Sequence, residues 1–198
     1  MLFTGKKIEG LREVDVSAYC SGPIVAISGS LRRDSINSAA LRALAAAAAG
    51  HGLSVAIDDS PRTLPHFDPD LERFAPEAVW RFREACRSAC GVVLAVPEYT
   101  FGIPGAFKNA LDWLVGSGSL YRKPVALLHV APFGRGGHVR EALADALRAH
   151  NADVTHHPVP IASRDRDVDG EISETQIVTE LRTVVAELAQ RAGASRAA

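Results

Sequence analysis

The sequence predicts an α/β fold, with a five-stranded parallel sheet between two layers of helices. Two features of the 198 residues predict it: short apolar stretches that suit strands buried on both faces, and longer stretches with the apolar spacing of helices. The two kinds alternate five times, and such alternation produces parallel sheets with right-handed crossovers. The expected strands are residues 23–28, 53–57, 91–96, 124–130 and 154–161, and the expected helices are residues 38–49, 76–89, 106–115, 138–150 and 173–191.

The composition suits one globular domain. Apolar residues make up 47% and charged residues 23% of the chain, close to globular averages. The net charge of −1 indicates no nucleic-acid surface, and no apolar run approaches the ~18–20 residues that cross a membrane. Three cysteines are too few for a disulfide framework, and the first residues do not resemble a secretion signal, so we expect a cytoplasmic protein. We expect an N-terminal extension at 1–22, the domain at 23–192 and a C-terminal tail at 193–198.

The loop after the first strand, residues 29–37, is the strongest candidate site. It leads into an alanine-rich helix that ends near Gly50. Unpaired backbone N–H groups and the helix dipole make such a loop an anion site, and the guanidinium of Arg32 can grip two phosphate oxygens. We therefore interpret the loop as a phosphate site. In the alternative interpretation, Ser35 only caps the helix, and Arg32 and Arg33 are solvated.

The loop after the second predicted strand suits the rim of a pocket, and the helix after it carries a weak signal for a metal site. Residues 58–72 are rich in proline and aspartate, and loops of this length often shape the rim of a pocket. The helix that follows has Pro76 in its first turn and an apolar stripe that includes Cys86 and Cys90. A spacing of four could hold a metal ion, but no second pair or histidine run completes a site, so we expect no metal.

The loop after the third strand, residues 97–105, combines rigid and open positions. Two prolines fix its backbone, and two glycines let another group approach closely. The next helix carries an apolar face. We expect its polar residues Lys108, Asn109 and Asp112 to hold the helix and its loop in place.

The last two predicted strands, with the loops and helices that follow them, carry no dinucleotide-binding motif. Residues 134–137 read G-R-G-G, which fails the G-x-G-x-x-G pattern, and no G-x-x-x-x-G-K-[ST] occurs. In the fifth strand, His156 and His157 are neighbours, so they point to opposite faces and cannot act together on one ligand. The final helix has an apolar stripe from Ile177 to Leu188 that suits the core.

The loops after strands one, three and four should meet, because the carboxyl ends of parallel strands share one edge of the sheet. One loop suits a phosphate. The other two offer backbone amides, glycines and the rings of Tyr99, Phe101 and Phe133. Together they suit a flat, conjugated ligand that carries a phosphate.

These loops resemble those of the NAD(P)H-dependent FMN reductase-like flavoproteins, which include flavin, quinone, azo and chromate reductases. Residues 29–37 read G-S-x-R-x-x-S-x-N, which is similar to the family's FMN phosphate loop. Residues 97–99 read P-E-Y and residues 104–113 read P-G-x-x-K-N-A-x-D-W, which resemble its flavin-ring loop and following helix. The resemblance covers residues 23–191. It implies a flavodoxin-like three-layer sandwich with strand order 2-1-3-4-5, bound FMN, and a homodimer or homotetramer whose interface borders the flavin.

The expected site residues belong to the three loops. The aromatic ones should form a largely uncharged rim, and no residue is expected to act as catalytic acid or base, because the flavin carries the chemistry. Phosphate contacts are expected from Ser30, Arg32, Ser35 and Asn37, backbone and ring-edge contacts from Pro97, Glu98, Tyr99 and Thr100, and the pocket wall from Phe101, Phe133 and Gly134.

Two departures from the family's pattern lie beside the expected ring. The family very often has Asn where Thr100 stands, and Ser where Ala131 or Pro132 stands. These changes bear on the tuning of the flavin and on acceptor specificity, and FMN binding is still expected.

We predict hydride transfer from NADPH or NADH to FMN, and then two-electron transfer to a flavin, quinone or similar small-molecule acceptor, in a ping-pong cycle. Two other classes stay open: a flavodoxin-type electron carrier, and a non-redox flavin-binding scaffold or sensor. Such carriers are usually strongly acidic, so the net charge of −1 argues against the first. The sequence does not distinguish NADH from NADPH, or one acceptor from another.

Overall fold

The computed structural model describes residues 22–49, 53–132, 134–172 and 174–197. Its sheet has five strands, all parallel, in the order β2-β1-β3-β4-β5. This is the flavodoxin-like order, so the predicted fold is confirmed. The strands are β1 (Ile24–Ser28), β2 (Val55–Asp58), β3 (Gly91–Ala95), β4 (Pro124–His129) and β5 (Asp153–Pro158).

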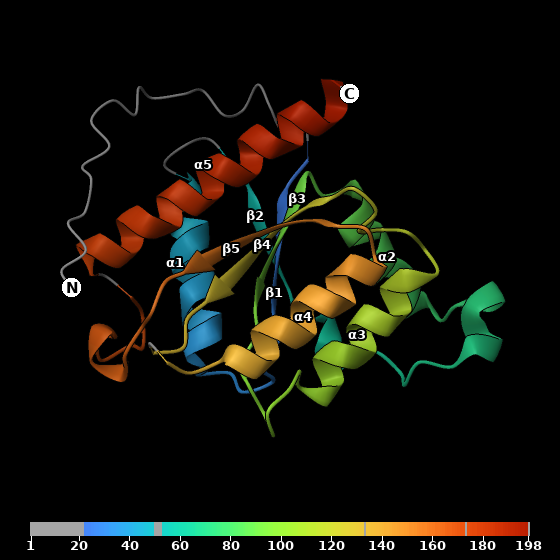
Figure 1. Cartoon of the computed structure of the whole chain (residues 1–198), viewed down its shortest axis with the longest axis horizontal. Helices are drawn as coiled ribbons and strands as arrows, with labels where there is room; N and C mark the ends of the chain where they lie inside the picture. The colour runs from blue at the N-terminus through green and yellow to red at the C-terminus, as the bar shows by residue number, and fades with distance from the viewer. Residues whose placement is uncertain (1–21, 50–52, 133, 173, 198) are drawn as a thin grey trace.

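Helices cover both faces of this sheet. Figure 1 shows α1 and α5 on one face and α2, α3 and α4 on the other. Each face has its own hydrophobic core: one contains Leu44 of α1 and Leu181 of α5, and the other contains Phe82, Phe107 and Leu143. The helices are α1 (Ile36–Ala49), α2 (Glu77–Ser88), α3 (Gly105–Val115), α4 (Gly137–Ala149) and α5 (Thr175–Ala197).

Strand β1 belongs to both cores. Ile24 and Ala26 pack in the core of α1 and α5, while Val25 and Ile27 pack in the opposite core. Successive residues of a strand point to opposite faces, and here both faces are covered. The continuous apolar run that predicted a strand buried on both faces is explained in this way.

Several boundaries differ from the predicted ones. Helix α1 begins at Ile36, two residues early, and α5 continues to Ala197, into the expected tail. Residues 58–72, expected as a loop, contain a 3₁₀ helix at Ser60–Arg62 and the start of another at Pro69–Phe74. Residues 1–21 of the expected N-terminal extension lie outside the described part of the chain.

Asn109 of α3 anchors the segment after β2. Its Oδ1 accepts a hydrogen bond from the N–H of Phe67 at 2.7 Å, and its Nδ2 donates to the carbonyl of Pro65 at 2.9 Å. Trp113 Nε1 donates to the same carbonyl at 2.8 Å. Asn109 therefore has the structural role that we predicted, although it holds the segment after β2 and not the loop before its own helix.

The structure contains neither a membrane span nor a metal cluster in its described residues. None of the helices described is both long and apolar enough to cross a membrane. No group of three histidine, cysteine or acidic residues is placed to hold a metal ion in the described ranges. Burial, and to a lesser degree the charge of Asp58, raises the pKa of Cys86 to about 12, which disfavours the thiolate that a metal ion needs.

Candidate functional site

Gly29 brings the loops after β1 and β3 together. A Cβ at this position would lie 2.6 Å from Cγ1 of Val96, which is closer than such atoms pack. The N–H of Gly29 also donates to the carbonyl of Ala95 at 2.8 Å. Glycine therefore allows the first loop to start directly against the third strand.

Hydroxyl groups organise the first loop. Ser35 caps α1, because its Oγ accepts a hydrogen bond from the N–H of Ser38 at 3.0 Å. The Oγ atoms of Ser35 and Ser38 are 2.8 Å apart, and Ser38 Oγ donates to Ser28 Oγ at 3.3 Å. Arg32 and Arg33 are exposed beside this network. The capping role is thus present, and the phosphate role of the loop stays a prediction.

A cavity of about 830 Å³ opens where the loops after β1, β3 and β4 meet. Its size is in the range of small-molecule and cofactor sites. Five of the predicted site residues line it: Asn37, Pro97, Glu98, Phe101 and Gly134.

Asn37 contributes a buried acceptor to this cavity. The residue is 4% exposed, and its Oδ1 has no hydrogen-bond partner among the described residues. A buried acceptor left unpaired costs about 1–3 kcal/mol, so a ligand donor at this point would be favourable. The cavity is therefore suited to a ligand with hydroxyl or N–H groups near the start of α1.

A tight turn shapes the third loop. Tyr99 and Gly102 exchange two backbone hydrogen bonds, of 3.1 and 3.0 Å, and the residues between them, Thr100 and Phe101, have φ of 50° and 56°. Two positive φ angles in a two-residue loop define a type I′ turn, which favours Asn and Gly and strains a β-branched residue. The turn holds Phe101 outward, 76% exposed, at the mouth of the cavity.

Glu98 connects the third loop to the fourth. Its Oε2 accepts a hydrogen bond from the N–H of Val139, in the first turn of α4, at 3.0 Å. A carboxylate is favourable there because the helix dipole and unpaired N–H groups attract negative charge. The N-cap of α4, Gly136, has φ of 78°, a left-handed conformation that glycine adopts without strain. Glu98 thus both lines the cavity and positions its opposite wall.

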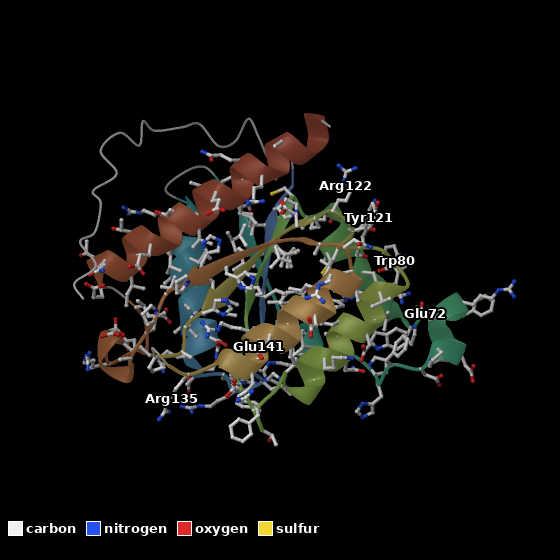
Figure 2. The ribbon with its side chains drawn as sticks, viewed as in Figure 1. Glu72, Trp80, Tyr121, Arg122, Arg135 and Glu141 are labelled. Atoms are coloured by element: carbon white, nitrogen blue, oxygen red, sulfur yellow. The ribbon has the colours of Figure 1, made fainter. Side chains whose placement is uncertain are left out.

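Two polar residues were missing from the predicted rim. Arg135 and His138 line the cavity, so the expectation of a largely uncharged rim was wrong. His138 packs edge-to-face on Phe101, with ring centroids 5.1 Å apart. Figure 2 shows Arg135 at the edge of the molecule, beside the start of α4. Both residues belong to the fourth loop or the helix turn that follows, so the shared sheet edge was a signal that could have found them.

The loop after β5 also contributes. Ile161 and Ala162 line the cavity, although only three loops were expected there. Because β5 lies next to β4 in the sheet, its carboxyl end reaches the same place. The strand order therefore explains this omission.

The other predicted site residues do not line the cavity, and one of them lies outside the described residues. Ser30, which is buried, has its Oγ 3.3 Å from the hydroxyl of Tyr99, so the first and third loops are joined by this contact. Neither these two residues nor Arg32, Ser35 and Thr100 line the cavity. Phe133 is outside the described residues.

A pair of histidines lies away from this cavity. His129 Nε2 and His156 Nδ1 are 3.0 Å apart, and the rings stack. His157 points elsewhere, with its Nε2 2.8 Å from Thr155 Oγ1, so the prediction that His156 and His157 face opposite sides is confirmed. Burial, and then the positive charges of His156, Arg140 and His157, lower the pKa of His129 to about 4.

Comparison with known proteins adds a family match. Residues 23–166 match the family model described as NADPH-dependent FMN reductase. The chain is 32% identical over 179 residues to a probable NADPH:quinone oxidoreductase 2 of Oryza sativa subsp. japonica, covering 83% of this chain and 86% of that protein.

Other relatives match over shorter stretches. The NAD(P)H-dependent FMN reductase PA1204 of Pseudomonas aeruginosa is 41% identical over 91 residues, which are 46% of this chain and 48% of that protein. The match to a quinone reductase of Pseudomonas putida, 36% identical, covers 58% of this chain and 62% of that protein. The alignments therefore span about half to three fifths of these two relatives.

The solved structures agree on the fold. FerB, a flavoenzyme NAD(P)H:(acceptor) oxidoreductase from Paracoccus denitrificans, superposes with a TM-score of 0.72 at 26% identity, over 86% of this chain and 97% of FerB. A flavodoxin from the domain Archaea shares the fold at 10% identity, with a TM-score of 0.55 over 86% of this chain and 98% of that one.

Proposed function

Because this chain belongs to the NADPH-dependent FMN reductase family, we propose that it is an oxidoreductase that binds FMN and carries electrons from NAD(P)H to a small-molecule acceptor. The FMN site we propose is the cavity between the loops after β1, β3 and β4. The observation that carries this proposal is the unpaired Oδ1 of Asn37, buried in the wall of that cavity.

The residues present suit FMN. A ribityl hydroxyl is the kind of donor that Asn37 Oδ1 lacks. The start of α1, with Ser30, Arg32 and Ser35 nearby, offers N–H groups, hydroxyls and a guanidinium for a phosphate. We propose these four residues as the phosphate and ribityl contacts.

We propose that the loops after β3 and β4 hold the ring. Pro97, Glu98 and Gly134 line the cavity with backbone that can approach a flat ligand, and the turn at Tyr99–Gly102 places Phe101 at its mouth. The hydrogen bond from the N–H of Val139 to the carboxylate of Glu98 holds the start of α4 next to this turn. When bound, FMN supplies the chemistry, because it can accept a hydride from a nicotinamide and pass two electrons on.

The acceptor we propose is a quinone, a free flavin or a similar flat molecule. Its chemistry is suggested by the relatives named as a quinone reductase and a probable NADPH:quinone oxidoreductase 2. Phe101 offers an aromatic face, while Arg135 and His138 offer donors to an oxygen of the acceptor. One open cavity must receive nicotinamide and acceptor in turn, so we propose ping-pong kinetics.

We also propose a homodimer or homotetramer with an interface next to the cavity. Tyr99 and Phe101 are 51% and 76% exposed on this edge, and burying such aromatic surface against a second copy would be favourable. Light scattering on the purified chain measures the assembly directly, and a monomer at micromolar concentration would contradict the proposal.

A titration of the FMN-free protein with FMN, riboflavin and FAD tests the proposed cofactor. We expect FMN to bind more tightly than riboflavin, because only FMN has the phosphate, and more tightly than FAD, whose bridged pyrophosphate does not fit a site for a terminal phosphate. Equal affinity for FMN and riboflavin would contradict the phosphate site.

A further inference from the structure

A second cavity at the same edge of the sheet carries three arginines. It has a volume of about 440 Å³ and lies between α1 and the end of β2. Arg33 comes from the first loop, Arg42 from α1, and Arg62 from the 3₁₀ helix Ser60–Arg62. We call this cavity the arginine pocket. No part of the proposed FMN cavity requires these three residues.

Against the three arginines, the described lining of the arginine pocket has one carboxylate, that of Asp59. Arg42 pairs with Glu171 through Nε at 2.7 Å, and Arg62 pairs through Nε with the largely exposed Asp59 at 3.8 Å. The long, exposed contact to Asp59 is a weak pair. Among the described residues, no acidic side chain pairs with Arg33, and none accepts a hydrogen bond from the Nη atoms of Arg42 or Arg62. Guanidinium groups with unused N–H donors are suited to bind a phosphate by two hydrogen bonds at once.

The remaining walls suit a nucleoside. Leu41 and Ile57 line the pocket, and Ile57 is 45% exposed, which leaves an apolar surface for a base. Ser28 and Ser38 add hydroxyl groups.

The arginine pocket adjoins the cavity where we place FMN. Asn37 lines one and Ser38, the next residue, lines the other, so the start of α1 separates them. A dinucleotide could therefore place its nicotinamide in the first cavity and its adenosine in the second. NADPH differs from NADH by a 2′-phosphate on that adenosine, and arginine side chains commonly recognise this group.

We propose that the arginine pocket binds the adenosine 2′-phosphate of NADPH, with Arg33, Arg42 and Arg62 as the phosphate ligands. This proposal rests on the proposed NAD(P)H-dependent function. It makes the chain select NADPH over NADH. The same phosphomonoester chemistry is present on FMN, so the experiment must distinguish the two sources.

The test is calorimetric titration of the FMN-loaded protein with adenosine 2′,5′-bisphosphate and with 5′-AMP, which lacks the 2′-phosphate. We expect the bisphosphate to bind at least tenfold more tightly. Arg62→Gln and Arg33→Gln should each weaken it about tenfold and lower the ratio of kcat/KM for NADPH over NADH by a similar factor. The control is Arg148→Gln, an exposed arginine on α4, which should change neither quantity.

Several results would overturn the proposal. Equal binding of the bisphosphate and 5′-AMP would show that the pocket does not recognise the 2′-phosphate. Weaker FMN binding in Arg62→Gln, with the bisphosphate unaffected, would assign the pocket to the FMN phosphate. If neither nucleotide reduces the flavin, the proposed function fails, and the titration still decides whether the pocket binds a 2′-phosphate.

Discussion

The carboxylate of Glu98 accepts a hydrogen bond from the backbone N–H of Val139, with Oε2 3.0 Å from the amide nitrogen. This contact joins the loop after β3 to the first turn of α4, and so fixes two walls of the proposed FMN cavity relative to each other. It also satisfies one of the unpaired N–H groups at the start of that helix.

Removal of this carboxylate should destabilise the protein. A half-buried, charged acceptor at a helix start contributes about 1–2 kcal/mol, so we expect Glu98→Ala to lower the free energy of unfolding by about that amount. Glu98→Gln should cost less, since its amide oxygen still accepts. Urea unfolding measures the free energy of unfolding of both variants. The control is Glu141→Ala, at an exposed position of α4. Equal losses in Glu98→Ala and Glu141→Ala would contradict the role of Glu98.

Thr100 should be a strained residue. Its φ of 50° lies in the left-handed region, which a β-branched side chain enters at a cost and asparagine tolerates well. We expect Thr100→Asn to raise the free energy of unfolding by about 0.5–1 kcal/mol. The matched control is Thr63→Asn, at a φ of −125°, which should bring no such gain. A gain of equal size at both positions would exclude relief of strain as its cause.

Much of the fold could be predicted from the sequence, because β1, β3 and β4 are mostly apolar runs and the helices carry apolar residues at helical spacing, whereas β5, which reads D-V-T-H-H-P, has no such run. The strand order 2-1-3-4-5 was predicted from the resemblance of the loop motifs to those of the FMN reductase-like family. The site was only partly predictable: the shared sheet edge placed Asn37, Glu98 and Phe101 together, but no local pattern indicates the left-handed turn or the bond from Glu98 to Val139. Such contacts depend on how the loops pack against each other, and that is decided by the tertiary structure.

Arg32 should contribute to FMN affinity through the phosphate. A charge-assisted hydrogen bond of this kind is worth about 1.5–3 kcal/mol, so we expect Arg32→Ala to weaken FMN binding roughly 10- to 150-fold. Fluorescence titration of the FMN-free protein measures this, and Arg148→Ala on α4 is the control for loss of an exposed positive charge. An unchanged dissociation constant would favour the alternative in which Arg32 is solvated and Ser35 only caps α1.

His129 should make the stability depend on pH. Burial, followed by the charges of His156, Arg140 and His157, lowers its pKa from 6.5 to about 4 in the folded protein. As the pH falls below about 6.5, the unfolded chain takes up this proton and the folded protein does not, so stability decreases until the pH reaches about 4 and then levels.

Urea unfolding between pH 7.5 and 4 tests the role of His129. We expect wild type to lose more stability over this range than His129→Gln. His66→Gln, at an exposed histidine, should retain the slope of the wild type. A His129→Gln profile parallel to that of the wild type would show that another group is responsible.

The most direct test of the central claim is reduction of the FMN-loaded protein by NADPH or NADH without oxygen, followed by stopped-flow absorbance. We predict that at least one nucleotide bleaches the FMN band near ~450 nm, and that adding a quinone restores it in one two-electron step. If neither nucleotide bleaches the band, the proposed reductase activity is contradicted, and an electron carrier or a non-redox flavin-binding scaffold takes its place.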